Sequence, residues 1–187
     1  MRAYYGTEGI VLAAYDRGET DRCMTFFTRD FGRVDAIAKG LRVISSKLRG
    51  HLTLFSRVRL LLTPGKEYWR ILDAETKDGG LPPEAPVQDF VNFLLALTVS
   101  GVPDSRIWEV IISMRGAKSR EDFFMNKIYV LETLGILPAQ EKLKYFFSPR
   151  ACAYIVGMSR DKFLENEEEV LLIALGIKKI LSANHMV

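Results

Sequence analysis

The chain has 187 residues, of which 48% are hydrophobic and 26% charged, and its formal net charge is +3. This composition excludes wholesale disorder, and the length allows one large domain or two small ones. No apolar run is long enough to cross a bilayer and no signal-peptide pattern opens the chain, so we expect a cytoplasmic protein without membrane contact. The two cysteines, Cys23 and Cys152, lie far apart, which excludes a disulfide scaffold and a cysteine-built metal site.

The first half of the chain contains five short β-rich runs separated by turn signals. They are GIVLAAY at 9–15, RCMTFFT at 22–28, VDAIAKG at 34–40, LTLFSRVRLLLT at 52–63 and YWRILDAET at 68–76. No amphipathic helix interrupts them. Five strands at this spacing predict a small closed or partly closed β-barrel.

Side chains alternate between the two faces of a strand, so the runs also predict which residues face the barrel interior. In the third run, Val34, Ala36 and Ala38 are predicted to face inward. Arg33, Ile37 and Lys39 are predicted to face outward. In the fourth run, Leu52, Leu54, Val58, Leu60 and Leu62 are predicted to point inward. Its outward set is Thr53, Phe55, Arg57, Arg59 and Leu61. Cations beside an exposed aromatic ring on one sheet face are suited to single-stranded nucleic acid.

Between the third and fourth runs lies KGLRVISSKLRGHL, residues 39–52, with four cations and no acid. The surrounding segment 33–70 holds nine Lys or Arg residues against two acids, a net charge of +7. Such a concentration attracts polyanions, chiefly nucleic acid or anionic membrane. Charge alone is equally consistent with a solvated basic face.

The second half changes from strand to helical periodicity after a Gly/Pro-rich hinge, GGLPPEAP, at 79–86. Five helices are predicted, over 87–101, 105–114, 119–135, 148–166 and 167–183. Ser119 followed by Asp122 partly matches a capping box, and Gly135 with Pro138 marks a helix end. The sequence therefore predicts a barrel domain at 1–78, a hinge at 79–86 and a helical domain at 87–187.

The sequence contains no nucleotide-binding loop and no catalytic motif of a known hydrolase, so we expect a protein that is not an enzyme. The early acids Asp16, Glu19, Asp21 and Asp30 could together hold a divalent cation, as in a nuclease. Solvated turn residues are the simpler interpretation, because no supporting residues accompany them in sequence.

The segment from Glu8 to about Leu62, with the pattern EGIVL…Y…GE.DR..T.FT..FG…AIAKG.R….S.LRG.L..F..V.L.L, resembles the N-terminal domain of the bacterial DNA repair family RecO. FFMNKIYVLETLGILP at 123–138 is similar to a helix of the same family. The resemblance implies an α+β protein of two domains, a five-stranded OB-fold barrel followed by an all-α domain. It implies a recombination mediator of the nucleoid that binds single- and double-stranded DNA and anneals strands. Its implied partners are RecR, the C-terminal tail of the single-strand binding protein and, indirectly, RecA, without cofactor or catalysis.

The chain departs from the family pattern in one place and in its length. Many members carry a four-cysteine zinc element after the LG.LP stretch. Residues 139–158 of this chain contain a single cysteine, Cys152. A structural zinc site needs four Cys or His ligands, so we expect no metal. The chain is also shorter than usual for the family, so a short form with a trimmed helical domain is expected.

Three functional hypotheses follow from these observations. The first is a DNA-binding mediator whose contacts are Arg33, Lys39, Arg42, Lys47, Arg49, Arg57 and Arg59, with Phe55 as a stacking ring. The second is a protein-interaction module with weak or no DNA binding. The third is a metal-dependent nuclease that uses the early acids.

Overall fold

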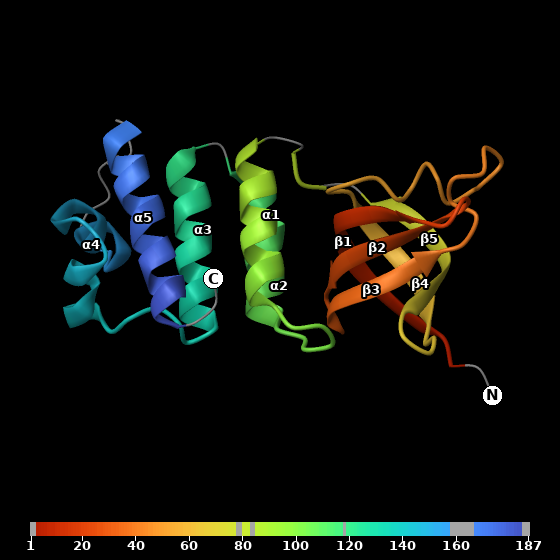
Figure 1. The fold of residues 1–187 in the computed structure, drawn as a ribbon, viewed down its shortest axis with the longest axis horizontal. Helices are drawn as coiled ribbons and strands as arrows, with labels where there is room; N and C mark the ends of the chain where they lie inside the picture. The colour runs from red at the N-terminus through yellow and green to blue at the C-terminus, as the bar shows by residue number, and fades with distance from the viewer. Residues whose placement is uncertain (1–2, 78–79, 83–84, 118, 158–166, 185–187) are drawn as a thin grey trace. The chain divides into compact units, whose positions relative to one another are not determined.

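The computed structural model describes residues 3–77, 80–82, 85–117, 119–157 and 167–184. Its first half contains five strands, as the sequence predicts (Figure 1). Their bounds are β1 Tyr5–Arg17, β2 Asp21–Thr28, β3 Gly32–Ala38, β4 Arg57–Thr63 and β5 Trp69–Lys77.

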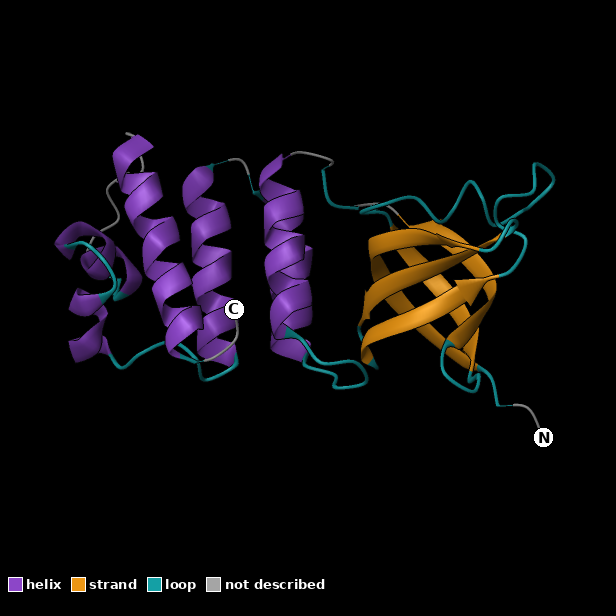
Figure 2. Cartoon of the chain, viewed as in Figure 1, coloured by secondary structure: helices purple, strands orange, loops and turns teal. Residues whose placement is uncertain are grey.

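The five strands close into a barrel in the order β1-β2-β3-β5-β4, and β4 pairs back onto β1 (Figure 2). All neighbours are antiparallel except β3 and β5, which are parallel and share a short register at Ala36↔Trp69 and Ile37↔Arg70. A five-stranded, partly open Greek-key barrel is the OB-fold. The predicted fold class is therefore confirmed, with helices following the barrel in the chain.

The barrel interior is a tightly packed apolar core. The predicted inward residues of β3 are confirmed, since Val34 is 2% exposed and its two alternate neighbours are fully buried. The other residues of this core come from all the strands and from the β3–β4 connection. They are Val11, Met24, Phe26, Leu41, Leu52, Val58, Leu60, Leu62, Ile71 and Ala74.

The predicted start of the fourth strand is wrong. Residues 52–56 lie outside any strand, with a turn at residues 54–55, and β4 begins only at Arg57. The alternation therefore breaks before the strand, because Leu54, expected inside, is 50% exposed while Phe55, expected outside, is 6% exposed. Phe55 also has a backbone φ of 66°, a left-handed conformation that a regular strand excludes.

A later segment of the chain covers the first part of β3. The amide of Gly101 donates to the carbonyl of Arg33 at 2.8 Å, and Ser100 forms a parallel bridge with Arg33. Gly32, at φ 63°, lies so close to this segment that an added Cβ would be 2.0 Å from the carbonyl oxygen of Val102. Only glycine fits this approach, because the position combines a left-handed φ with a backbone contact.

The helices of the second half follow the predicted order, with small shifts at their ends. Their bounds are α1 Ala85–Leu97, α2 Ser105–Ser113, α3 Arg120–Thr133, α4 Pro149–Ile155 and α5 Glu167–Ala183, with short 3₁₀ turns η1 Met114–Gly116 and η2 Gln140–Tyr145. The η2 turn has no counterpart in the sequence prediction. The C-terminal part of the predicted 148–166 helix, residues 158–166, lies outside the described residues.

The partial capping box at the start of α3 forms completely. The Asp122 amide donates to the Ser119 hydroxyl at 3.1 Å, and the Ser119 amide donates to the Asp122 carboxylate at 3.0 Å. An Asp in place of the usual Glu therefore suffices for both bonds. The same helix ends at Thr133, and Gly135 just beyond it has a φ of 69°, which fits the left-handed stop that the sequence predicts.

The chain divides into two compact units, residues 1–91 with 98–115 and residues 92–97 with 116–187. The predicted hinge at 79–86 stays a prediction, and residues 78–79 and 83–84 lie outside the described part of the chain. Of the helices that the structure describes, none combines the length and apolar character required to cross a membrane.

Candidate nucleic-acid interface

The basic connection, which we define as residues 39–52, follows β3 directly and is fixed to the barrel at both ends. Leu41 and Leu52 are 3% and 4% exposed and belong to the barrel core. The amide of Gly40 donates to Asp21 Oδ1 at 2.8 Å, and that of Arg42 donates to the Thr20 carbonyl at 3.0 Å. The connection is therefore a series of turns held against the β1–β2 turn.

The far end of the basic connection is fixed to β5. The imidazole Nδ1 of His51 accepts the backbone N–H of Thr76 at 3.2 Å and lies 3.0 Å from the Thr76 hydroxyl. This role of His51 depends on a contact across the barrel, which the sequence around it does not indicate.

The arginine cleft lies where the basic connection meets the start of β2. Its volume is about 190 Å³, and it is lined by Arg22, Arg42 and Arg49 over the apolar floor of Leu41 and Leu52. Three guanidinium groups around one concave site present the bidentate donors that phosphate oxygens accept. The cleft is therefore a candidate site for a phosphate group.

One carboxylate partly neutralises the arginine cleft. Asp16 Oδ1 accepts from Arg22 Nε at 2.7 Å, and Asp16 Oδ2 lies 3.6 Å from Arg42 Nη1. The hydrogen bond from Arg22, reinforced by the charge of Arg42, lowers the pKa of Asp16 despite the opposing effect of desolvation. Arg42 also donates to the Gly18 carbonyl at 3.1 Å, which fixes its side chain over the β1–β2 turn.

The other cations of the basic connection are exposed. Lys47 and Arg49 form no ion pair with any described residue. Lys39 is also exposed and is close enough to Asp21 to contribute to the lowered pKa of that carboxyl, whose largest cause is the Gly40 amide. Four of the predicted contact residues thus lie on one connection, and two of them line one cleft.

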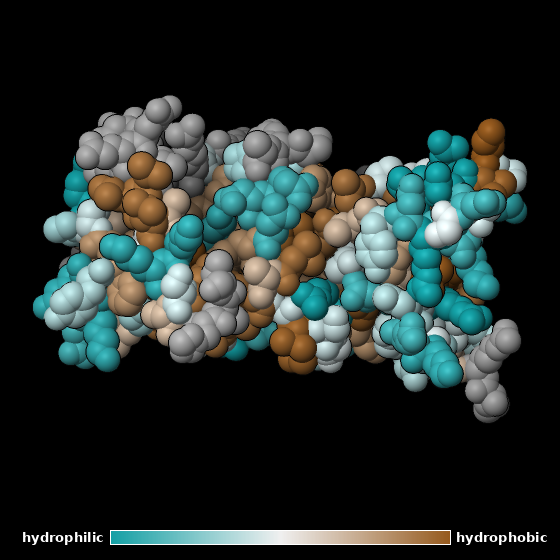
Figure 3. Space-filling view, in the orientation of Figure 1, coloured by the Kyte–Doolittle hydropathy of each residue, from teal (hydrophilic) through white to brown (hydrophobic). Residues whose placement is uncertain are grey.

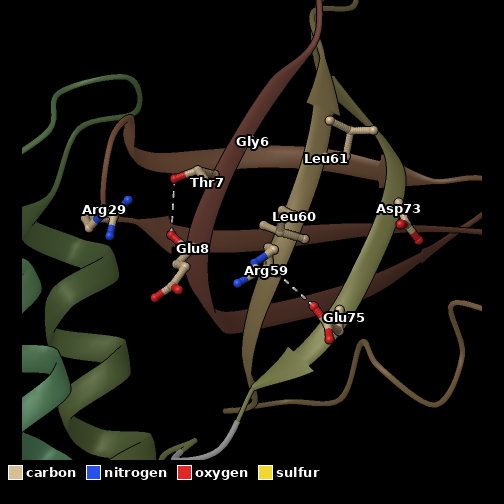
Figure 4. A pocket seen from close by; sticks show the side chains of 9 residues that line it. All are labelled: Gly6, Thr7, Glu8, Arg29, Arg59, Leu60, Leu61, Asp73 and Glu75. Atoms are coloured by element: carbon tan, nitrogen blue, oxygen red, sulfur yellow. Dashed lines mark hydrogen bonds and ion pairs between the residues drawn. The ribbon is translucent and has the colours of Figure 1, made fainter.

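The predicted strand cations lie in different surroundings. Arg57 and Arg59 of β4 form ion pairs with Glu8 at 2.6 Å and with Glu75 at 3.4 Å. Figure 4 shows the Arg59–Glu75 pair beside a hollow of about 540 Å³ on β1, β4 and β5. The residues that line this hollow carry both signs, since Glu8, Asp73 and Glu75 accompany Arg29 and Arg59. The β4 face is therefore of mixed charge rather than basic.

Arg33 lies at the opposite end of β3 from Lys39. Its Nε donates to the Ser100 hydroxyl at 3.3 Å, so it is engaged with the 98–103 segment. The structure thus does not bring all seven predicted cations onto one face.

The prediction that Phe55 is an exposed stacking ring is wrong. Its side chain is buried, and its amide donates to the Val11 carbonyl at 2.9 Å while its carbonyl accepts from Leu81 at 2.8 Å. The turn before β4 rotates the ring away from solvent, which a simple strand alternation does not anticipate.

Sequence reasoning also missed Arg22. The residue pairs with Ala38 at the last position of β3, which places its side chain beside the basic connection that follows. The signal that could have found it is the hairpin register of β2 and β3, counted outward from their turn.

The early acids do not come together as a metal site. Asp16 faces arginines, Asp21 accepts from Gly40, and Asp30 accepts from Thr7 at 2.7 Å. Within the described ranges no group of three or more His, Cys, Asp or Glu side chains is placed to hold a metal ion.

Comparison with known proteins shows which protein family the barrel resembles. Residues 1–79 match the family described as "Recombination protein O N terminal". The chain is 43% identical over 72 residues to a DNA repair protein RecO of Bifidobacterium adolescentis, which covers 38% of this chain and 29% of that protein. It is 34% identical over 116 residues to the DNA repair protein RecO of Acaryochloris marina, covering 59% of this chain and 40% of the relative.

A third relative, DNA repair protein RecO of Synechocystis, is 43% identical over 77 residues, 41% of this chain and 28% of the relative. The chain thus matches well under half the length of each of these three relatives. The agreement covers the barrel, the β1–β2 turn and the basic connection. Residues 1–79 of this chain, which contain the barrel, are therefore similar to the N-terminal domain of the RecO family of DNA repair proteins.

Proposed function

We propose that the protein is a non-catalytic, DNA-binding recombination mediator of RecO type that acts in the cytoplasm at the nucleoid. The observation that carries the proposal is the arginine cleft, which lies beside the exposed cations of the basic connection. Phosphate groups of single- or double-stranded DNA are the polyanion that this arrangement suits. Strand annealing and recombinase loading are the activities that the family resemblance adds.

The proposed contact uses charge rather than base edges. Arg22, Arg42 and Arg49 hold one backbone phosphate in the cleft, and Lys39 and Lys47 contact neighbouring phosphates. Such binding is nearly independent of sequence and weakens steeply with salt, because each contact releases condensed counterions. Arg33, Arg57 and Arg59 contribute as secondary contacts, since each is already engaged with a protein partner.

The proposed partners are RecR, the C-terminal tail of the single-strand binding protein and, indirectly, RecA. These partners follow from the family resemblance and not from a contact in this structure. The helical unit contains a cleft of about 320 Å³ whose lining combines apolar side chains such as Met125, Ile128 and Leu143 with the polar Glu132 and Gln140. An annealing assay on DNA coated with the cognate single-strand binding protein tests DNA contact and partner contact together.

The test of DNA binding compares two variants that each lose two positive charges. Lys47→Ala/Arg49→Ala removes two cations of the basic connection, and Lys178→Ala/Lys179→Ala removes two exposed cations of α5. We expect the first variant to bind short single-stranded DNA at least about tenfold more weakly, with the slope of log affinity against log salt reduced by about 1.4. The α5 variant should bind like the wild type. Equal binding by all three proteins, or salt-independent binding, would refute the assignment.

The second candidate function is an OB-fold protein-interaction module with weak or no DNA binding. The mixed-charge hollow beside β1, β4 and β5 favours this alternative, because surfaces with both signs suit protein partners. A wild-type protein that fails to bind single-stranded DNA even at low salt would refute the first proposal and favour the alternative.

A further inference from the structure

An apolar tip interrupts the basic connection. Ile44 is 91% exposed and Val43 is 43% exposed, and Ile44 is the most exposed large hydrophobic side chain in the described part of the protein. Figure 3 shows a small hydrophobic patch at this end of the barrel, surrounded by hydrophilic surface. Two adjacent apolar side chains exposed at a loop tip are suited to contact a ligand.

The exposure of the tip is built into the turn geometry. The Val43 amide donates to the Gly40 carbonyl at 3.1 Å, and the Ser46 amide donates to the Val43 carbonyl at 3.0 Å. Gly40 adopts a φ of 63°, which starts this pair of turns. Leu41, two residues before the tip, is buried in the barrel core, and the turns that follow it leave Val43 and Ile44 exposed.

The charge around the tip indicates what covers it. Lys39 and Arg42 precede it, Lys47 and Arg49 follow it, and residues 39–52 contain no acid. A ligand that fits must therefore combine a strongly negative component with an apolar face within one loop's reach. Nucleic acid has this combination, since its phosphates flank the flat apolar faces of the bases.

We infer that Val43 and Ile44 act as an apolar wedge against DNA bases while the flanking cations hold the phosphates on either side. This inference rests on the proposed DNA binding and adds a contact to the bases themselves. Apolar side chains inserted at a base step unstack it, and the cost is offset by the additional contacts. A wedge of this kind holds bases of a single strand apart from one another, in a state ready to pair with a complement.

The test uses single-stranded DNA that carries the fluorescent adenine analogue 2-aminopurine, whose emission rises when it is unstacked. Val43→Ser/Ile44→Ser changes only exposed side chains, so the barrel should fold as in the wild type. The matched control is Leu171→Ser on α5, a side chain that is 60% exposed. We expect the wild type and the control to raise the emission at saturation. The tip variant should bind the DNA about tenfold more weakly than the wild type does. At saturation with the tip variant, the 2-aminopurine emission should stay at the level of the free DNA.

Three other results would each overturn the inference. If the tip variant binds DNA and raises the emission as the wild type does, the wedge is refuted and the proposed DNA binding still stands. If the wild type does not bind DNA at all, both the wedge and the proposed DNA binding are refuted. Binding of the wild type, but not of the tip variant, to vesicles of anionic phospholipid, without any change in 2-aminopurine emission, would assign the tip to a membrane surface.

Discussion

The Nη2 of Arg57 donates to Glu8 Oε2 at 2.6 Å across the β1–β4 pair, where the two side chains are only 25% and 21% exposed. The hydrogen bond from Arg57 lowers the pKa of Glu8, against the opposing effect of desolvation. The Nε of Arg57 is itself buried without a hydrogen-bond partner among the described residues. The guanidinium therefore depends on Glu8 for its neutralisation, and removing the Glu8 charge would leave the Arg57 charge uncompensated in a part-buried site.

Replacing Glu8 by Gln should lower the free energy of unfolding at neutral pH by about 1.5–3 kcal/mol, because a charge-assisted hydrogen bond becomes a neutral one. The folded-state pKa of Glu8 is depressed, so its contribution is fully present above its ordinary value of 4.5 and is lost as pH falls through the folded value. Denaturant unfolding of both proteins across this range checks the prediction. A difference that stays constant down to strongly acidic pH would contradict it.

Replacing Asp16 by Asn should strengthen DNA binding. The change removes the carboxylate that holds Arg22 and Arg42, which leaves both guanidinium groups available to phosphate. We expect affinity for single-stranded DNA to rise several-fold, with a salt slope up to about 0.7 steeper. Glu109→Gln, at an exposed position of α2, makes the same change in net charge away from the cleft. An equal gain in both variants would show a general effect of net charge.

Replacing Phe55 by Ala should cost about 3–5 kcal/mol of stability, because a buried ring is removed. Thermal or denaturant unfolding measures this loss. Phe55→Leu keeps an apolar side chain and a folded barrel, and it should bind DNA as tightly as the wild type. If a folded Phe55→Leu protein bound DNA more weakly than the wild type, the Phe55 ring would contact the bases after all, and the prediction would be wrong.

The close approach of Gly32 to Val102 makes a matched pair of glycine substitutions informative. Gly18 and Gly32 both adopt a φ of 63°, but an added Cβ at Gly18 meets nothing within 4 Å. Gly18→Ala should therefore cost only the conformational penalty of about 1–2 kcal/mol. Gly32→Ala should cost clearly more, because the 98–103 segment must also move. Equal unfolding free energies for the two variants would show that the segment yields freely.

Local periodicity explains why much of the barrel is predictable from sequence. The alternation of Val34, Ala36 and Ala38 is set by the strand itself, and the capping box at Ser119 by four adjacent residues. The basic connection is visible as a run of cations without acids. These features depend on residues close in sequence, where intrinsic geometry decides the outcome.

Most of the features that the sequence could not predict depend on pairing between distant residues. The ion pairs of Arg57 and Arg59 come from β1 and β5, so a cation-rich strand does not make a basic face. Arg22 reaches the cleft through the β2–β3 register. The burial of Phe55 results from a turn with a positive φ, which neither propensity nor alternation favours for a bulky residue.

The parallel bridge between Arg33 and Ser100 has a consequence for any shortened form of this protein. Because β3 and β5 share only the register at Ala36 and Ile37, the first part of β3 would present an unpaired edge on that side. The Gly101 amide donates a hydrogen bond to the Arg33 carbonyl there. A segment from beyond the predicted hinge therefore covers this edge of β3. A fragment that stopped at residue 82 would leave this edge open, and open strand edges recruit strands from other chains. The barrel alone would therefore tend to self-associate, and its isolation as a monomer requires residues 98–103.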